Sequence, residues 1–591
     1  ECPCRGIPCT LLHHWRSRDG SVYARQPYLL QRTYRQVLMS NRMLTLMMGF
    51  VAFLILAVGV VFVLALAGGG DDDSGGTPAS ADKTPKPNTS GDICKGETLI
   101  VPGDDPSSVL DPIQVGDVST SEYIVEIFGG LVTLDPDLKV QPDLAKELPT
   151  VSNNGKTYTF KLRDNAVFQN GQRVTADDFK YSIERAADPT NASPTVLAYL
   201  GNIVGVKDRF ANKAASVSGV KVIDETTIQI DLIEPSDFFL SELTYPVAFV
   251  VDKKTVEKNP RNWTQSPNGT GPFRLKEFKP AEKITLVRNE RYHLGAPKLE
   301  EVDFELAGGS ILTRYENNEI HIGGFPATQL DSVKSGSSPL SKDYREVPEM
   351  ATFYFTLNPA QKPFDDPKVR QAFAMSIDRE NINNVLLYNA YRVADGFLPP
   401  EMPGYTESVT SYKYDPVKAK QLIQDSTYAG KLPRIVLSYS GTGSAPGDLL
   451  VAIQKGWQDA LGVDISLQAI DSSAFLREQR KGGFQMHSDG WSADYPDPED
   501  FLGKLFASDS QLNYTKYKND AVDALLSQAR TEQDRAKRYT LYAQAEQKII
   551  DDATVIPTFW PVTHTLVKSC VQGLPNTSMT IPKYRYVDIK E

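Results

Sequence analysis

The segment 490–502 carries residue types suited to binding an organic cation. Trp491 lies three residues before Asp494, and the sequence Tyr-Pro-Asp-Pro follows directly. Each proline fixes its own φ and disfavours helix at the residue before it, so we expect a stiff backbone around Asp494. A carboxylate can pair with an ammonium while an indole packs on the carbon skeleton of the same ligand. On these residues alone a solvated surface turn is the simpler interpretation, so the rest of the chain must decide.

Length and charge narrow the classes of protein. The chain has 591 residues, 41% of them hydrophobic, which is enough for several domains. The net charge is −11, yet residues 1–42 carry seven Arg and only two acidic residues. The remaining chain is therefore strongly acidic. This balance argues against a nucleic-acid partner, because phosphates require basic surfaces.

Residues 43–67 form an uncharged and mostly apolar segment. At about 1.5 Å per residue, such a helix would span the hydrocarbon core of a membrane. Arg residues precede the segment and Asp71 to Asp73 follow it, so the positive-inside rule places the body outside the cytoplasm. Its length favours a membrane anchor, whereas Ala65-Leu66-Ala67 resembles a signal-peptidase site, and both interpretations remain open. We expect the body at the extracytoplasmic face of the cell membrane.

The residues that flank this segment are of two kinds. Residues 1–42 are either a basic cytoplasmic segment or, since Met39 or Met43 would make a conventional start, misassigned upstream sequence. Residues 68–92 are rich in Gly, Asp, Ser, Pro and Thr, which predicts a flexible linker. The cysteines and histidines of the first 14 residues fit no standard zinc spacing, so no metal site is predicted there.

From Leu99 onward the hydrophobic pattern predicts mixed α/β structure. Residues 98–101 read as a strand and 122–131 as a helix. Asn153-Asn154-Gly155 predicts a hairpin turn, and Thr175 to Asp178 predicts the capping box of a helix. Asp366-Pro367 predicts another helix start. Strands at 434–440 and 463–467 flank a helix that ends near Gly462, which predicts a parallel β-α-β unit; two further helices are expected at 520–530 and 532–551.

In order and spacing, several segments resemble extracellular solute-binding proteins of family 5, the peptide-binding proteins of bacterial ABC importers. The resemblance covers residues 99 to 583, and no single motif within it is decisive. The matching segments are 154–163, Phe168, 170–171, 175–182, 269–273, Phe355, 357–358, 363–366, 369–372, 377–379 and 491–502.

This resemblance implies a fold and its boundaries. We expect an α/β, two-lobed clamshell of the type II periplasmic-binding-protein class with an extra domain, preceded by one transmembrane or signal helix. Lobe I would combine 93–137, 263–350 and 552–591; the extra domain would be 138–262; and lobe II would be 351–551. The crossings near 350 and 551 would form the hinge, and closure would bury a ligand between the lobes.

Two cysteines of the body are of interest for the same architecture. Cys94 and Cys570 are its only cysteines, and an extracytoplasmic setting permits a disulfide. Two separate buried thiols are the alternative. The implied fold places both residues in lobe I, which agrees with a bridge.

The resemblance also implies the ligand site. In close relatives an Asp at the position of Asp494 pairs with the α-ammonium of a peptide, and Trp491 would line the same pocket. Asp117, Asn358 and Trp560 are expected to face the cleft. The implied partners are a short peptide and the permease subunits of an ABC importer, with no cofactor, and we expect a membrane-anchored monomer.

Other functions remain as alternatives. The same fold could bind a metal chelate, an oligosaccharide or a small cation, although the histidines at 293, 321, 487 and 564 have no ligand spacing. A membrane-anchored peptide sensor would share every feature described so far. A hydrolase using Asp494 and Asp497 is disfavoured, because the sequence contains no nucleophile elbow or zinc motif. We therefore expect a binding protein and not an enzyme.

Overall fold

The computed structural model describes residues 93–441 and 446–590. The predicted membrane segment 43–67, the linker 68–92 and residues 1–42 lie outside the described residues. Among the helices of the described part, none is long and apolar enough to cross a membrane. We keep the names lobe I, extra domain and lobe II for the ranges defined above; this division itself stays a prediction.

Lobe I contains a four-stranded sheet in the order β1-β10-β9-β8. The predicted strand near residue 98 is confirmed as β1, which pairs in parallel with β10. Buried and partly exposed residues alternate along β1, as expected for a strand with one face on the core. The strands are β1 (Thr98–Pro102), β8 (Phe273–Lys279), β9 (Lys283–Arg288) and β10 (Glu301–Glu305).

The helix predicted at 122–131 is displaced: α2 spans Val118–Ile127. It starts earlier because the Asp117 carboxylate accepts the backbone N–H of Thr120 at 2.8 Å and caps the helix. It ends earlier because Phe128 is extended and the backbone of Gly129 and Gly130 bonds elsewhere. The Gly129 carbonyl accepts the Val250 N–H at 3.0 Å. Apolar spacing alone did not reveal either end.

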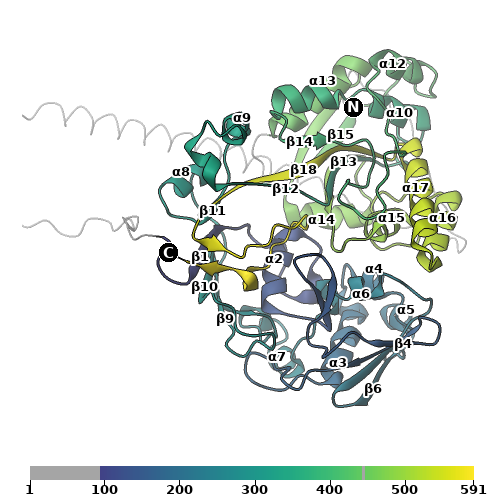
Figure 1. Cartoon of the computed structure of the whole chain (residues 1–591). Coiled ribbons are helices and arrows are strands. Elements are labelled where there is room, and N and C mark those ends of the chain that lie inside the picture. Colours follow the sequence, from purple (N-terminus) through teal and green to yellow (C-terminus); the bar gives the residue numbers. More distant parts are fainter. Residues whose placement is uncertain (1–92, 442–445, 591) are drawn as a thin grey trace, which may run out of the picture. The chain divides into compact units, whose positions relative to one another are not determined.

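The extra domain packs α3 (Ala176–Ala186) on a second four-stranded sheet, ordered β4-β5-β7-β6. Both local predictions are confirmed: β4 and β5 form a hairpin, and Thr175 and Asp178 form the capping box. The domain is drawn at the bottom of Figure 1. Its strands and remaining helices are β4 (Thr150–Ser152), β5 (Thr157–Lys161), β6 (Val220–Asp224), β7 (Thr227–Asp231), α4 (Val196–Leu200), α5 (Val206–Phe210), α6 (Phe239–Glu242) and α7 (Lys253–Lys258).

An eight-stranded sheet with the path β11-β18-β13-β17-β15-β16 joins the strands of lobe II to β11, β12 and β18, which lie in the ranges predicted for lobe I. Strands β15 and β16 pair in parallel, which confirms the predicted β-α-β unit around α13. Strands β12 and β14 also pair with β18. The strands are β11 (Ile322–Gly323), β12 (Tyr344–Pro348), β13 (Ala351–Leu357), β14 (Tyr391–Val393), β15 (Ile435–Ser440), β16 (Ile465–Ile470), β17 (Met486–Ser492) and β18 (Val555–Val567).

Helices cover this sheet and close a separate core around Trp457, whose Nε1 donates to the Phe373 carbonyl at 2.9 Å. Asp366 caps α10 with Pro367 in its first turn, as predicted. The helices are α10 (Pro367–Met375), α11 (Arg379–Asn381), α12 (Pro416–Gln424), α13 (Asp448–Leu461), α14 (Ser472–Lys481), α15 (Leu502–Phe506), α16 (Asp520–Thr531) and α17 (Arg535–Asp552). The remaining strands and α-helices of the described residues are β2 (Val132–Leu134), α8 (Ile311–Glu316), α9 (Leu330–Lys334), β19 (Val571–Gln572) and β20 (Asp588–Ile589) in lobe I, and β3 (Val140–Pro142) in the extra domain.

The chain passes between the lobes twice, once between β12 and β13 and once along β18, which is antiparallel to both. The first half of β18 pairs with β13, and its second half pairs with β12 and β11. Figure 1 shows β18 running along this path. The start of β18 thus pairs with a strand of lobe II and its end pairs with strands of lobe I. At the crossing, the N–H of Glu349 donates to the Pro561 carbonyl at 3.1 Å, so the two connections lie side by side.

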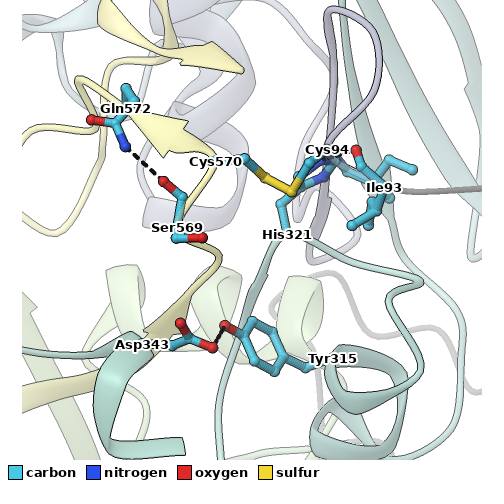
Figure 2. Close-up of a disulfide and its surroundings, with 9 residues drawn as sticks. Ile93, Cys94, Tyr315, His321, Asp343, Ser569, Cys570 and Gln572 are labelled. Atoms are coloured by element: carbon cyan, nitrogen blue, oxygen red, sulfur yellow. Dashed lines mark hydrogen bonds between the residues drawn. A yellow bond between two sulfur atoms is a disulfide. The ribbon is translucent and has the colours of Figure 1, made fainter. Parts of the chain in front are cut away.

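The predicted disulfide between Cys94 and Cys570 is confirmed, with 5.7 Å between the two Cα atoms. Figure 2 shows His321 beside it. The Nδ1 atom of His321 accepts the Ile100 N–H at 2.9 Å, and Nε2 lies 2.9 Å from the Ile93 carbonyl. A neutral imidazole that donates from Nε2 satisfies both bonds. The bridge and this histidine together join the start of the body to its end.

Candidate functional site

Lobe I, the extra domain and lobe II all line one cavity, which we call the Asp494 cavity. It encloses about 1010 Å³, part of it open to solvent. Lobe II contributes Ala493 and Asp494, while the extra domain contributes Thr244 to Pro246 and Phe249. The lobe I wall includes the apolar residues Val125, Phe128, Val132, Leu134, Met579 and Ile581. A mostly apolar chamber with a few convergent polar groups is typical of a ligand site.

A second cavity of about 1240 Å³ lies between Asp117 of lobe I and Gly490 of lobe II, and we call it the Asp117 cavity. Tyr354 and Asp489 also line it. Gly490 and Asp494 are four residues apart, so the same stretch of chain lines both cavities. The structure therefore sets Asp494 and Asp117 beside neighbouring parts of the space between the lobes.

Hydrogen bonds, and not only the prolines, hold the Asp494 turn. The Ala493 N–H donates to the Met350 carbonyl at 2.8 Å, which continues the pairing of β17 with β13. The Asp494 N–H donates to Asp500 Oδ2 at 2.9 Å, and Trp491 Nε1 lies 3.4 Å from the same oxygen. Asp497 is tied down as well, because Arg538 donates to both its oxygens at 2.6 and 2.8 Å. The turn is thus rigid before any ligand arrives.

The carboxylates of Asp494 and Asp500 lie in an environment of low polarity. Burial raises the pKa of Asp494, while the hydrogen bond from Tyr199 and the charge of Lys504 lower it. Burial and the charge of Asp494 raise the pKa of Asp500 well above its usual range. Asp500 is fully buried, and its Oδ1 has no hydrogen-bond partner among the described residues. An added cation would offset the desolvation of this acidic pair.

Tyr199 of the extra domain reaches Asp494 across the boundary between the lobes. Its hydroxyl donates to Asp494 Oδ2, and its ring stacks on that of Tyr245 with 3.9 Å between centroids. Asp494 still exposes part of its surface to the cavity. The extra domain therefore orients the Asp494 carboxylate through Tyr199, and lobe II holds the Asp494 backbone through Asp500. The remaining surface of the carboxylate faces the cavity.

The other predicted residues lie in different surroundings. Trp491 is half-buried against the core and touches the site through Asp500. Asn358 uses its amide within lobe II: Nδ2 donates to the carbonyls of Gly482 and Phe484 at 3.0 and 2.9 Å. Asn358 does not line either cavity. These contacts give Asn358 a structural role, and its contact with ligand stays a prediction.

Trp560 is 5% exposed and packs beside Tyr405 and Arg392, 5.8 Å from the tyrosine ring centroid. It does not line either of the two cavities. Within the described residues there is no group of three or more His, Cys, Asp or Glu side chains that could hold a metal ion. The structure therefore places Asp494 and Asp117 each at one of the two cavities, whereas Trp491, Asn358 and Trp560 line neither.

Sequence reasoning missed four residues around Asp494: Tyr199, Glu242, Asp500 and Lys504. One of them had a usable signal. Lys504 is the only charged residue in Phe-Leu-Gly-Lys-Leu-Phe, and a lysine within such an apolar run indicates a buried cation that requires a partner. Nothing local distinguishes Tyr199 or Glu242, since each contacts lobe II from the distant extra domain.

A family model described as bacterial extracellular solute-binding proteins, family 5, matches residues 139–513. The chain belongs to this family. The periplasmic oligopeptide-binding protein OppA of Salmonella typhimurium is 31% identical over 483 residues, which are 78% of this chain and 87% of that protein. The dipeptide-binding protein DppE of Bacillus subtilis is 31% identical over 555 residues, which are 90% of this chain and 97% of DppE.

Solved structures support the same assignment. The structure of the Escherichia coli murein tripeptide binding protein MppA aligns with a TM-score of 0.76 and 27% identity, covering 84% of this chain and 99% of MppA. The unliganded open form of MppA gives a lower TM-score of 0.62, at 28% identity over 84% of this chain and 98% of that one. This protein is thus an extracytoplasmic solute-binding protein with the α/β fold of type II periplasmic binding proteins. Its structure is less similar to the open form of MppA than to the first MppA structure.

Proposed function

We propose that this protein captures short peptides between its lobes and delivers them to the permease of an ABC importer. Its family consists of solute-binding proteins, and the relatives named above are described as binding oligopeptides, dipeptides or a murein tripeptide. The observation that carries the proposal is an open strand edge beside a partly buried carboxylate. The backbone of a peptide can pair with the strand edge while its ammonium group binds the carboxylate.

The open edge belongs to β17. Its residues 486 and 487 pair with β15, whereas the ladder to β13 continues to Ser492. From Ser488 to Ser492, β17 therefore has no ladder partner on the β15 side among the described strands. An extended peptide can add to such an edge through main-chain hydrogen bonds, which suits ligands of varied sequence.

Asp494 would bind the α-ammonium of the peptide. An ammonium that enters a closed cleft loses its water, so a charged partner must offset the cost. Trp491 stiffens the turn through Asp500, and Asp117 faces the Asp117 cavity, where the peptide would continue past Gly490. Residues 43–67 would hold the protein at the membrane, with the body on the extracytoplasmic side.

Native mass spectrometry tests this proposal. The purified full-length protein is incubated with a defined mixture of di-, tri- and tetrapeptides, and bound masses are recorded before and after gas-phase release. We expect adducts with the masses of peptides, absent when the same peptides are N-acetylated. Retention of only a metal chelate or an oligosaccharide from the expression host, with no peptide adduct at millimolar concentration, would reject peptide capture.

A further inference from the structure

A buried ion pair joins the extra domain to lobe II next to the proposed ammonium site. Lys504, on α15, donates from Nζ to Glu242 Oε1 and to the Ala198 carbonyl of the extra domain. The side chains of Lys504 and Glu242 are 5% and 4% exposed. Glu242 is the last residue of α6, and Ala198 lies in α4. Lys504 of lobe II thus binds two separate helices, α4 and α6, of the extra domain.

Lys504 also lies against the aromatic residues that orient Asp494. Its Nζ is 4.9 Å from the ring centroid of Tyr199 and 6.0 Å from that of Tyr495. These contacts combine a cation with two ring faces in a desolvated position. The same Tyr199 donates to Asp494, so the ion pair and the ligand carboxylate share one aromatic neighbour.

The extra domain is attached differently to lobe I. Arg185 and Asp111 form a paired contact at 2.5 and 2.9 Å, and Gln169 Nε2 donates to the carbonyls of Ile127 and Phe273. Backbone bonds such as Val250 to Gly129 add to this attachment. The extra domain and lobe I are thus expected to move together. A separation from lobe II would break the contacts of Lys504.

We propose that Lys504 and Glu242 form a clasp that holds the extra domain closed on lobe II and so keeps Tyr199 in place on Asp494. In this role Lys504, Glu242 and Tyr199 are positioning residues, and the proposal rests on the proposed function only in taking Asp494 as the ligand carboxylate. Contacts between Gln511 and the extra domain, at 2.9 Å to the Ser193 carbonyl and 3.0 Å from the Leu197 N–H, extend the same interface.

The energetic character of the clasp follows from its burial. A buried ion pair roughly breaks even against apolar neighbours, whereas removal of one partner leaves an uncompensated charge. Each single variant should therefore open the clasp, and a variant that neutralises both partners should close again. This pattern distinguishes a clasp from two residues that merely add stability independently.

Hydrogen exchange of the full-length protein measures the clasp without any ligand. The amides to follow are those of α15 and of residues 198–200, which exchange slowly when the interface is closed. In Lys504→Met and in Glu242→Gln we expect these amides to exchange at least about tenfold faster than in the wild type. In the double variant, exchange should return to within about threefold of the wild-type rate.

Arg185→Met is the matched control, because it breaks a buried pair of the same domain that faces lobe I. It should lower the melting temperature without selectively accelerating the amides of α15. Slow exchange in both single variants, a double variant as fast as the two effects combined, or equal acceleration of α15 by Arg185→Met would each overturn the clasp.

Calorimetry with trialanine separates the clasp from the proposed function. If both are correct, the single variants bind trialanine at least about tenfold more weakly and the double variant recovers. If the exchange pattern appears but no variant binds trialanine or any other short peptide, peptide capture fails and the clasp stands. If all variants bind trialanine with wild-type affinity, the clasp does not position Asp494 and that part of the proposal fails.

Discussion

Replacing Asp494 by Asn tests the central electrostatic argument. Asn has nearly the same shape, and its Oδ1 can still accept the hydrogen bond that Tyr199 donates. The substitution therefore removes the charge and little else. Removing one partner of a buried charge pair costs about 3–5 kcal/mol. Lys504 and Tyr199 already stabilise the Asp494 carboxylate in part, which favours the lower end of that range.

A loss of about 3 kcal/mol corresponds to roughly a hundredfold weaker affinity for a free-amine peptide. Isothermal titration calorimetry with trialanine and N-acetyl-trialanine, on the wild type and on Asp494→Asn, gives the four corners of a cycle. Acetylation should weaken binding strongly in the wild type and much less in the variant, since the charge pair is already absent there. Additive effects of acetylation and mutation would show that Asp494 does not bind the ammonium.

The pH dependence gives the same argument a second readout. Burial raises the pKa of Asp494 above its usual range, and a bound ammonium would lower it again. Binding must therefore release a proton from molecules in which Asp494 is protonated, so wild-type affinity should fall as pH decreases from 8 toward 5. Asp494→Asn should lack this dependence. A wild-type affinity that rises toward pH 5 would refute the electrostatic account.

Four further predictions concern the rest of the molecule. Cleavage of the Cys94–Cys570 bridge should lower stability by up to about 5 kcal/mol, because it closes a very long loop; melting with and without reductant measures this, and equal melting temperatures would contradict it. In Lys504→Met, whose clasp is expected to be open without ligand, saturating peptide should reduce the radius of gyration in small-angle scattering, because closure moves one lobe toward the other; an unchanged radius at saturation would indicate a preformed site. Burial raises the pKa of Glu546 to about 7, so its ionised form disfavours the folded state and stability falls as pH rises from 4.5 to 7. Glu546→Gln can keep the hydrogen bonds that the Phe397 and Leu398 N–H groups donate to Glu546, at 2.7 and 2.9 Å. This variant should therefore be about 3 kcal/mol more stable than the wild type at pH 8 and equally stable near pH 4. Chemical denaturation at both pH values measures this difference, and equal stability at pH 8 would contradict the argument. Protease added to intact cells should digest the body and leave residues 1–42 protected, whereas a protected body would contradict the extracytoplasmic assignment.

The sequence by itself determined features that depend on neighbours along the chain. The capping box at Thr175, the hairpin at Asn153 and the helix start at Asp366 all formed as predicted, because each rests on bonds within a few residues. The Cys94–Cys570 bridge was predictable for another reason. Two cysteines in the body allow only one pairing, whatever the distance between them.

Only the tertiary structure decided how the site is assembled. Tyr199 and Asp494 are 295 positions apart, and Glu242 and Lys504 are 262 apart, so no local pattern links them. The same holds for Asn358, whose amide is occupied by the carbonyls of Gly482 and Phe484. Spacing and periodicity report the face on which a side chain lies, but its partner depends on how separately folded lobes close on one another. Burial then sets the electrostatics, since desolvation in the folded protein raises the pKa of Asp494.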